Sequence, residues 1–201
     1  MNEPPQADRN RCAWAQGSEN YLRYHDLEWG VPVHDDNTLF EFIVLEGAQA
    51  GLSWSTILNK REAYRRAFDH FDPRKVAHFT ARQRDQLVLN KAIVRNRAKI
   101  DAAITNARAV LSIQQEFGSL DNYLWRFVNG EPIQNHWTNA EEIPNRTVHS
   151  DTLSKDLKQR GFKFVGPIIC YAFMQAVGMV NDHTIDCFRY ATCAAVATND
   201  A

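Results

Sequence analysis

The chain has 201 residues, enough for one well-buried domain or at most two small ones, and its hydrophobic content of 44% is ordinary for a globular protein. Its net charge of −1 supplies no global field that would attract nucleic acid, so any DNA binding depends on local basic patches. The first ten residues lack the basic start and apolar run of a secretory signal, which favours a cytoplasmic protein.

The longest apolar stretch, GPIICYAFMQAVGMV, has about fifteen residues and includes Tyr171 and Gln175. A membrane span requires roughly twenty residues with few polar groups, so this stretch predicts a buried core helix and no membrane partner. The chain has four cysteines. They are expected to be thiols or metal ligands, because a chain of this size without an export signal rarely uses disulfides.

Residues 1–10 are polar and contain two prolines, and we expect a flexible N-terminal arm. A single helical domain over 11–190 and a C-terminal tail over 191–201 complete the predicted organisation. Within the domain, apolar residues at helical spacing predict a helix over 39–51 and another over 54–71.

Cap residues mark the next helices. Asp72, followed by a proline, is typical of the start of a helix over 73–79, and Thr80 of one over 81–90. A long helical run over 95–117 comes next and ends at Gly118.

Ser119 begins a helix that ends at Gly130. Residues 131–149, with two prolines and no clear period, predict a loop. Because no alternating strand pattern longer than four or five residues is present, the sequence predicts an all-α fold.

A polar helix that begins at Ser150 or Asp151 is closed by Gly161, and an apolar helix begins near Gly166. The segment over about 151–178 therefore has the outline of a helix-hairpin-helix. The glycines let the backbone approach a phosphate closely, and the N–H groups that begin the second helix offer an anion site. Basic residues cluster around the turn: Lys155, Lys158, Arg160 and Lys163. The alternative is a solvated helix with a glycine cap, and the pair of glycines favours DNA binding.

His183 and Cys187 lie four residues apart on what we expect to be a helix, so that the imidazole and the thiol face the same way. Cys12 and His25, near the other end of the chain, form a second pair of donors. Together the four would make a tetrahedral zinc site that joins the two ends of the chain. Core packing is the competing interpretation, and the spacing alone leaves both open. With four protein ligands, such a zinc would be structural.

Five segments carry a family resemblance. They run in order from about Arg11 to Arg189, without a large gap: RCAW, YLRYHDLEWGVPVHDD, LFEFIVLEGAQAGLSW, RGFKFVG and FMQAVGMVNDH. In these segments the chain resembles the 3-methyladenine DNA glycosylase I family of the helix-hairpin-helix glycosylase superfamily. The resemblance implies that family's all-α fold and the flipping and excision of 3-methyladenine from alkylated duplex DNA in base excision repair. It also implies a structural zinc on four ligands: Cys12, His25, His183 and Cys187. A monomer is the default expectation for a protein that scans DNA for lesions.

Alkylation at N3 makes adenine a delocalised cation and a good leaving group, so its pocket should be aromatic, since each ring face attracts a cation by about 1–2 kcal/mol. Rings lie in the matching stretch: Trp14, Tyr21, Tyr24, Trp29 and Trp54. The resemblance implies that Tyr24 and Trp54 stack on the base and that Glu46 is the catalytic acceptor that reads its edge. A buried ion pair is the alternative for Glu46, core packing is the alternative for any single ring, and Trp29 is expected to be mainly structural.

Superfamily members that cleave the DNA backbone carry a lysine after the hairpin and an activating aspartate in a later V-D-x-H motif. Here Ile168 and Asn181 hold the matching positions, so no Schiff base can form and strand cleavage is not expected. The adjacent Asp182 is expected at a helix start, where its side chain would point elsewhere. The enzyme should therefore depend on the lability of a cationic base and ignore neutral lesions.

A flipped base leaves a gap in the duplex. In the family this gap is filled by the loop that matches residues 49–52, in which Leu52 is the bulky apolar candidate; a core leucine at a helix end is its alternative. The DNA contacts that the resemblance implies are Gly51, Leu52, Gly161, Lys163 and Gly166.

Two other classes of protein compete with this interpretation. A non-catalytic DNA-binding module could keep the same scaffold, but it has no use for the base pocket of Glu46, Tyr24 and Trp54. A zinc hydrolase requires an open metal position, which four protein ligands would exclude.

Overall fold

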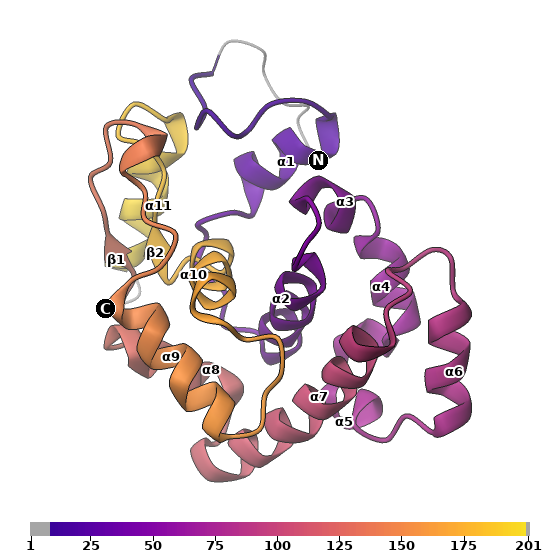
Figure 1. Ribbon diagram of the computed structural model, residues 1–201. Coiled ribbons are helices and arrows are strands. Elements are labelled where there is room, and N and C mark those ends of the chain that lie inside the picture. Colours follow the sequence, from indigo (N-terminus) through magenta and orange to yellow (C-terminus); the bar gives the residue numbers. More distant parts are fainter. Residues whose placement is uncertain (1–8, 200–201) are drawn as a thin grey trace.

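The computed structural model describes residues 9–199 and is built mainly of helices (Figure 1). In chain order the α-helices are α1 (Glu19–Leu27), α2 (Asp36–Gln49), α3 (Trp54–Leu58), α4 (Arg61–Ala67), α5 (Pro73–Val76), α6 (Ala81–Leu89), α7 (Arg97–Phe117), α8 (Leu120–Trp125), α9 (Val148–Gln159), α10 (Pro167–Ala176) and α11 (Phe188–Asn199). Short 3-10 helices lie between them: η1 (Asp69–Phe71), η2 (Arg126–Val128) and η3 (Ala140–Glu142).

The all-α prediction is confirmed apart from one small feature. Strands β1 (Ile133–Gln134) and β2 (Val180–Asn181) pair in parallel, with Ile133 opposite Val180. Two residues are too few for an alternating pattern, so the sequence does not reveal the pair. It joins the loop before α9 to the segment that leads into α11.

Helix α2 runs through the centre of the molecule and is buried on every side between Leu39 and Ala48. Helix α10 lies beside it (Figure 1), and its buried face confirms the predicted core helix. Gly47 lies where α2 packs tightly against the hairpin before α10, because a Cβ there would lie 3.1 Å from the Cβ of Phe164. The absent side chain lets the hairpin pack against α2 one residue from Glu46.

Most of the predicted helix starts are confirmed. The side chains of Asp72, Thr80 and Ser119 each accept a hydrogen bond from a backbone N–H in the first turn of their helix. The predicted start of α9 at Ser150 or Asp151 is wrong. Thr147 and Ser150 exchange side chain to backbone hydrogen bonds across the first turn, so that Thr147 is the cap.

The helix predicted over 54–71 is divided into α3, α4 and η1. The first break precedes Arg61, whose buried guanidinium pairs with Glu41 on α2. The second follows Phe68, where residues 69–71 take positive φ. That conformation places Phe71 in the core against Phe40 and Phe68. Burial of the Phe71 ring favours this bent backbone over a straight helix.

The C-terminal segment differs from the prediction. His183 and Cys187 do not lie on a helix; they lie in the turns between β2 and α11. Helix α11 begins one residue after Cys187 and extends into the predicted tail.

Of the predicted N-terminal arm, residues 1–8 fall outside the described part of the chain. Asn10 is bound to the C-terminal segment, because its side chain donates to Asp186 and its backbone carbonyl accepts from the N–H of Phe188. The start of the described chain therefore lies against the turn before α11 and the first residue of that helix. None of the described helices has the length and apolar character that crossing a membrane requires.

Candidate functional site

A pocket of about 350 Å³ lies between α1, the end of α2, the start of α3 and α10, within the range of small-ligand sites. Its lining includes all five residues predicted to contact the base: Trp14, Tyr21, Tyr24, Glu46 and Trp54. The remaining lining residues were not predicted to form the base pocket: Trp29, Gln49, Ala140, Ile143, Ala172 and Gln175.

The missed residues carry little signal in the sequence. Ala140 and Ile143 lie in or beside η3, in a stretch without a period. Ala172 and Gln175 lie three positions apart on α10 and so share a face, but the sequence does not say which face of a core helix borders a cavity.

Glu46 is the acidic residue of the pocket. It is 4% exposed, and no described residue forms a hydrogen bond or an ion pair with its carboxyl group. Burial without a partner raises the pKa of Glu46 to about 8. The buried ion pair of α2 belongs to Glu41 and Arg61 instead. An unpaired buried acid destabilises a fold, and such groups are concentrated at functional sites.

Tyr24 and Trp54 form adjacent walls of the pocket. Their ring centroids are 5.3 Å apart and their planes are inclined by 50°, so at most one ring can lie parallel to a given bound base. Burial raises the pKa of Tyr24 well above its ordinary value, which keeps its hydroxyl group protonated. The Nε1 atom of Trp54 is buried and donates to no described residue. The walls thus offer aromatic faces to a ligand.

Trp14 joins the pocket to a second cluster of side chains. Its ring meets Tyr21 edge-on at 5.4 Å and Trp29 at 4.9 Å. It also contacts His25 at 5.2 Å, and Trp29 contacts His183 at 4.6 Å. Trp29 is buried, as expected of a structural residue, but it lines the pocket as well.

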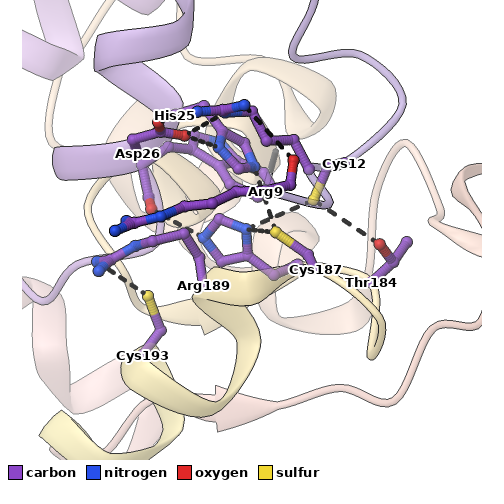
Figure 2. Close-up of polar contacts among 11 residues, drawn as sticks. Arg9, Cys12, His25, Asp26, Thr184, Cys187, Arg189 and Cys193 are labelled. Atoms are coloured by element: carbon purple, nitrogen blue, oxygen red, sulfur yellow. Dashed lines mark hydrogen bonds and ion pairs between the residues drawn. The ribbon is translucent and has the colours of Figure 1, made fainter. Parts of the chain in front are cut away.

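The four predicted metal ligands come together in the structure. The donor atoms of Cys12, His25, His183 and Cys187 lie within 4.8 Å of one another, and all four residues are buried. Figure 2 shows Cys12, His25 and Cys187 converging from the N-terminal segment, α1 and the turn before α11. The correction of the local structure around His183 therefore leaves the predicted ligand set intact.

The outward nitrogens of both imidazoles are held by acceptors. His25 Nδ1 donates to Asp26 Oδ1 at 2.9 Å (Figure 2), and two nitrogens of Arg11 donate to the same carboxylate. His183 Nε2 donates to the carbonyl oxygen of Trp29 at 3.1 Å. These bonds place the protons on the outward nitrogens and direct both lone pairs into the cluster.

The sulfur atoms complete the set of donors. Cys187 Sγ lies 3.5 Å from both inward nitrogens, and Cys12 Sγ lies 3.4 Å from His183 Nδ1. The hydrogen bond between the thiols lowers the pKa of Cys187 and raises that of Cys12. Two sulfurs and two oriented nitrogens around one point fit a tetrahedral zinc ion.

The predicted helix-hairpin-helix is formed by α9, the turn over 160–166 and α10. Gly161 has φ +89° and ends α9, and Gly166 begins α10. The backbone N–H of Lys163 is occupied, because it donates to Asn106 on α7, and its side chain is exposed. No described residue accepts from the N–H of Val165 or Gly166, which leaves these groups for an anion.

The basic cluster beside the hairpin is smaller than predicted. Arg160 donates to Glu116 on α7 and to Asp156 on its own helix, and these two carboxylates neutralise it. Lys155, Lys158 and Lys163 remain exposed and are the cations of this face.

The loop after α2 has the form expected of a wedge. Gly51 takes φ +77°, and a Cβ at this position would meet no atom within 4 Å, so the loop is open to solvent on this side. Leu52 is 41% exposed, which excludes the alternative of a core leucine. Gln49, at the end of α2, borders the pocket, so the loop and the pocket are contiguous.

The two positions that differ from strand-cleaving enzymes do not line the pocket. Ile168 is exposed on the first turn of α10. Asn181 is buried, and its amide donates to Gln134 and to the carbonyl of Tyr190. Contrary to the expectation from the sequence, Asp182 does not begin a helix; it follows β2, buried among four hydrogen-bond donors.

Comparison with known proteins agrees with this site. The family model described as methyladenine glycosylase matches residues 14–190. DNA-3-methyladenine glycosylase 1 of Escherichia coli is 52% identical over 180 residues, which cover 90% of this chain and 96% of that protein. DNA-3-methyladenine glycosylase of Haemophilus influenzae is 48% identical over 177 residues, covering 88% and 96%.

Solved structures give the same result. A crystal structure of 3-methyladenine DNA glycosylase I superposes with a TM-score of 0.87 at 50% identity, covering 89% of this chain and 98% of that one. A structure of the Staphylococcus aureus enzyme, described as the basis of its 3-methyladenine recognition, gives 0.88 at 42% identity, covering 90% and 97%. The helical fold and the pocket thus define an enzyme of the DNA glycosylase class. Within that class, the chain belongs to the methyladenine glycosylase family.

Proposed function

We propose that this protein flips 3-methyladenine out of duplex DNA and cleaves its glycosidic bond without cutting the DNA backbone. The names of its relatives support the substrate, since the proteins that cover nearly all of this chain are 3-methyladenine DNA glycosylases. The observation that carries the proposal is Glu46, a buried acid with no partner among residues 9–199, in a pocket of aromatic rings.

The pocket suits a purine that carries a positive charge. Ionised Glu46 would accept hydrogen bonds from the edge of the base and offset its charge, and the faces of Tyr24 and Trp54 would attract the same cation. A cationic base is a good leaving group, so little further activation is needed. A neutral adduct would bury the acid without a counter-charge, and we expect it to be excised poorly.

Two surface elements are suited to the duplex. Leu52 projects from the loop next to the pocket and would fill the gap that a flipped base leaves. A backbone phosphate would bind at the hairpin, through the open N–H group of Gly166 and the charge of Lys163, while Gly161 forms the turn that ends α9. With Ile168 where lyases carry their nucleophile, hydrolysis should leave an abasic site and an intact strand.

We further propose that Cys12, His25, His183 and Cys187 hold one zinc ion. Their orientation by Asp26 and by the carbonyl of Trp29 supports this assignment. Zinc bound by four protein ligands supplies a cross-link between the ends of the domain and takes no part in hydrolysis.

The test is the release of free base from methylated duplex DNA. Wild-type protein should liberate 3-methyladenine and leave the strands unbroken until the abasic sites are cleaved chemically. Glu46→Gln should lower the single-turnover rate by about 10- to 100-fold, the effect of losing a charged hydrogen bond.

Glu131→Gln is the matched control, because Glu131 is an exposed acid outside the pocket. Its rate should equal that of the wild type. Binding of methylated DNA without base release would identify a non-catalytic binding module. Equal rates for the Glu46→Gln variant and the wild type would refute the role of Glu46.

A further inference from the structure

Asp182 lies at the centre of a buried hydrogen-bond network behind the pocket. Its Oδ1 atom accepts from Asn135 Nδ2 at 2.6 Å and from Trp137 Nε1 at 2.7 Å. Its Oδ2 atom accepts from the Tyr171 hydroxyl and from Gln175 Nε2, both at 2.7 Å. Asp182 is fully buried, and its four partners are neutral donors.

This network fixes the orientation of the Gln175 side chain. A carboxylate only accepts hydrogen bonds, so the amide nitrogen of Gln175 must face Asp182. The carbonyl end then points away from Asp182, and Oε1 accepts from no described residue. Gln175 lines the base pocket, whereas Asp182 does not. The free carbonyl is therefore the end of the amide that the pocket receives.

We infer that Gln175, locked by Asp182, is a specificity-determining acceptor that favours an adenine-type base over a guanine-type base. The inference rests on the proposed excision of methylated purines. Adenine carries an amino group at C6, which donates, and guanine carries a carbonyl group there, which accepts. Because the Gln175 amide cannot reverse, its carbonyl oxygen accepts a hydrogen bond from the adenine amino group and repels the guanine carbonyl group.

Tyr171 and Gln175 lie one turn apart on α10 and share Oδ2 of Asp182, which leaves the Gln175 amide little freedom to rotate. An unconstrained glutamine could present its NH2 group instead and accept guanine equally well. The fixed orientation of the Gln175 amide is thus the physical reason why adenine is favoured over guanine. It adds to Glu46, whose ionised carboxylate is also an acceptor.

The experiment compares Gln175→Met with the wild type on duplex DNA that carries both 3-methyladenine and 3-methylguanine, under single-turnover conditions. Methionine keeps the length of the side chain and removes both ends of the amide. The rate for 3-methyladenine should fall about tenfold, the effect of one lost hydrogen bond to a neutral partner. The rate for 3-methylguanine should stay level or rise, so the adenine to guanine ratio should fall by tenfold or more.

Asn135→Ala is the matched control, because it also removes one donor from Asp182 but lies outside the pocket. Its rate ratio should equal that of the wild type, even if both variants melt at lower temperature. Quenching of tryptophan fluorescence by the two free bases gives a second ratio that is independent of DNA binding.

An unchanged ratio in Gln175→Met, in both measurements, would overturn the inference while leaving the proposed function in place. A ratio that falls equally in Asn135→Ala would also overturn it, since the effect would then be structural. If the wild type releases neither base, the proposed function itself fails.

Discussion

The ionisation of Glu46 decides whether the pocket attracts a cation. Burial raises the pKa of this group to about 8, so the carboxyl group is largely neutral at pH 7 in the free protein. A bound cation would favour the ionised form and draw the proton off. Binding of the lesion and ionisation of Glu46 are therefore linked.

This linkage predicts the pH dependence of excision. Because kcat/KM reports the free enzyme, it should rise with pH, by up to tenfold per pH unit, and level off near pH 8. The measurement is initial release of 3-methyladenine between pH 6 and 9. Glu46→Gln should give a flat profile, and a wild-type profile without this rise would contradict the assignment.

The same residue predicts a dependence of stability on pH. Below its ordinary pKa near 4.5, Glu46 is neutral in both the folded and the unfolded chain. As pH rises toward 8, the unfolded chain ionises first, so the folded state loses stability until both states are ionised. Because glutamine does not ionise, Glu46→Gln should be more stable than the wild type above pH 5, by at most about 5 kcal/mol at pH 8.5. Urea unfolding of both proteins at pH 4.5 and 8.5 tests this, and an equal difference at the two pH values would disprove it.

Leu52 carries a prediction that separates flipping from base recognition. Leu52→Ala removes the proposed wedge, so excision from duplex DNA should fall about tenfold. Excision from methylated single strands, where no stack has to be filled, should be unchanged. Leu89→Ala is the control, because Leu89 is exposed but lies outside the pocket. An equal loss on both kinds of DNA would assign Leu52 to the pocket or the fold.

At the level of elements, the end of α2 is held by α7. Lys99 Nζ donates to the carbonyl oxygens of Ala48 at 2.8 Å and Ala50 at 2.6 Å. These carbonyls have no partner within their helix, and a cation at a helix C-terminus is favourable. Lys99 therefore fixes the point at which the loop with Gly51 leaves the helix.

Removing this contact should loosen the loop and spare the pocket. We expect Lys99→Met to lower the free energy of unfolding by about 1–3 kcal/mol and to slow excision from duplex DNA severalfold. Binding of free 3-methyladenine, followed by tryptophan fluorescence, should change little. Lys75→Met, at an exposed lysine, should alter none of these quantities. A loss of free-base binding in Lys99→Met would show that the contact shapes the pocket itself.

Helix boundaries could be predicted where the residues that set them lie within one turn of the boundary. Asp72, Thr80 and Ser119 cap helices through bonds within one turn, and the sequence shows those bonds directly. The division of the segment over 54–71 could not be predicted, because Phe71 leaves the helix to pack against Phe40 on another helix. The paired strands could not be predicted for the same reason, since each has its partner far along the chain.

At the level of the whole molecule, the same limit applies to the site. The cluster of cysteines and histidines and the pocket residues were predicted from the family resemblance, whereas spacing alone left core packing of His183 and Cys187 open. Gln175 was missed because its role depends on Asp182 and on the side of α10 that meets the pocket. A site whose residues come from distant segments of the chain can be recognised only once the fold has brought them together.

The cluster of cysteines and histidines and the base pocket share a wall, which gives metal removal a specific consequence. Trp14 contacts His25 and Trp29 contacts His183, and both tryptophans line the pocket. If the cluster holds the proposed zinc, its removal would release the N-terminal segment from the turn before α11.

We therefore expect one zinc ion per chain by elemental analysis, and a lower melting temperature after chelation. Tryptophan emission should shift as Trp14 and Trp29 loosen, and affinity for free 3-methyladenine should fall in parallel. Cys12→Ala should reproduce these effects and lose the metal. Cys170→Ala should keep zinc and the emission spectrum, because Cys170 is a buried thiol outside the cluster. If chelated protein kept its full affinity for the free base, the cluster would stabilise the chain ends without supporting the pocket. Contacts through Trp14 and Trp29 would then not link the metal to base binding.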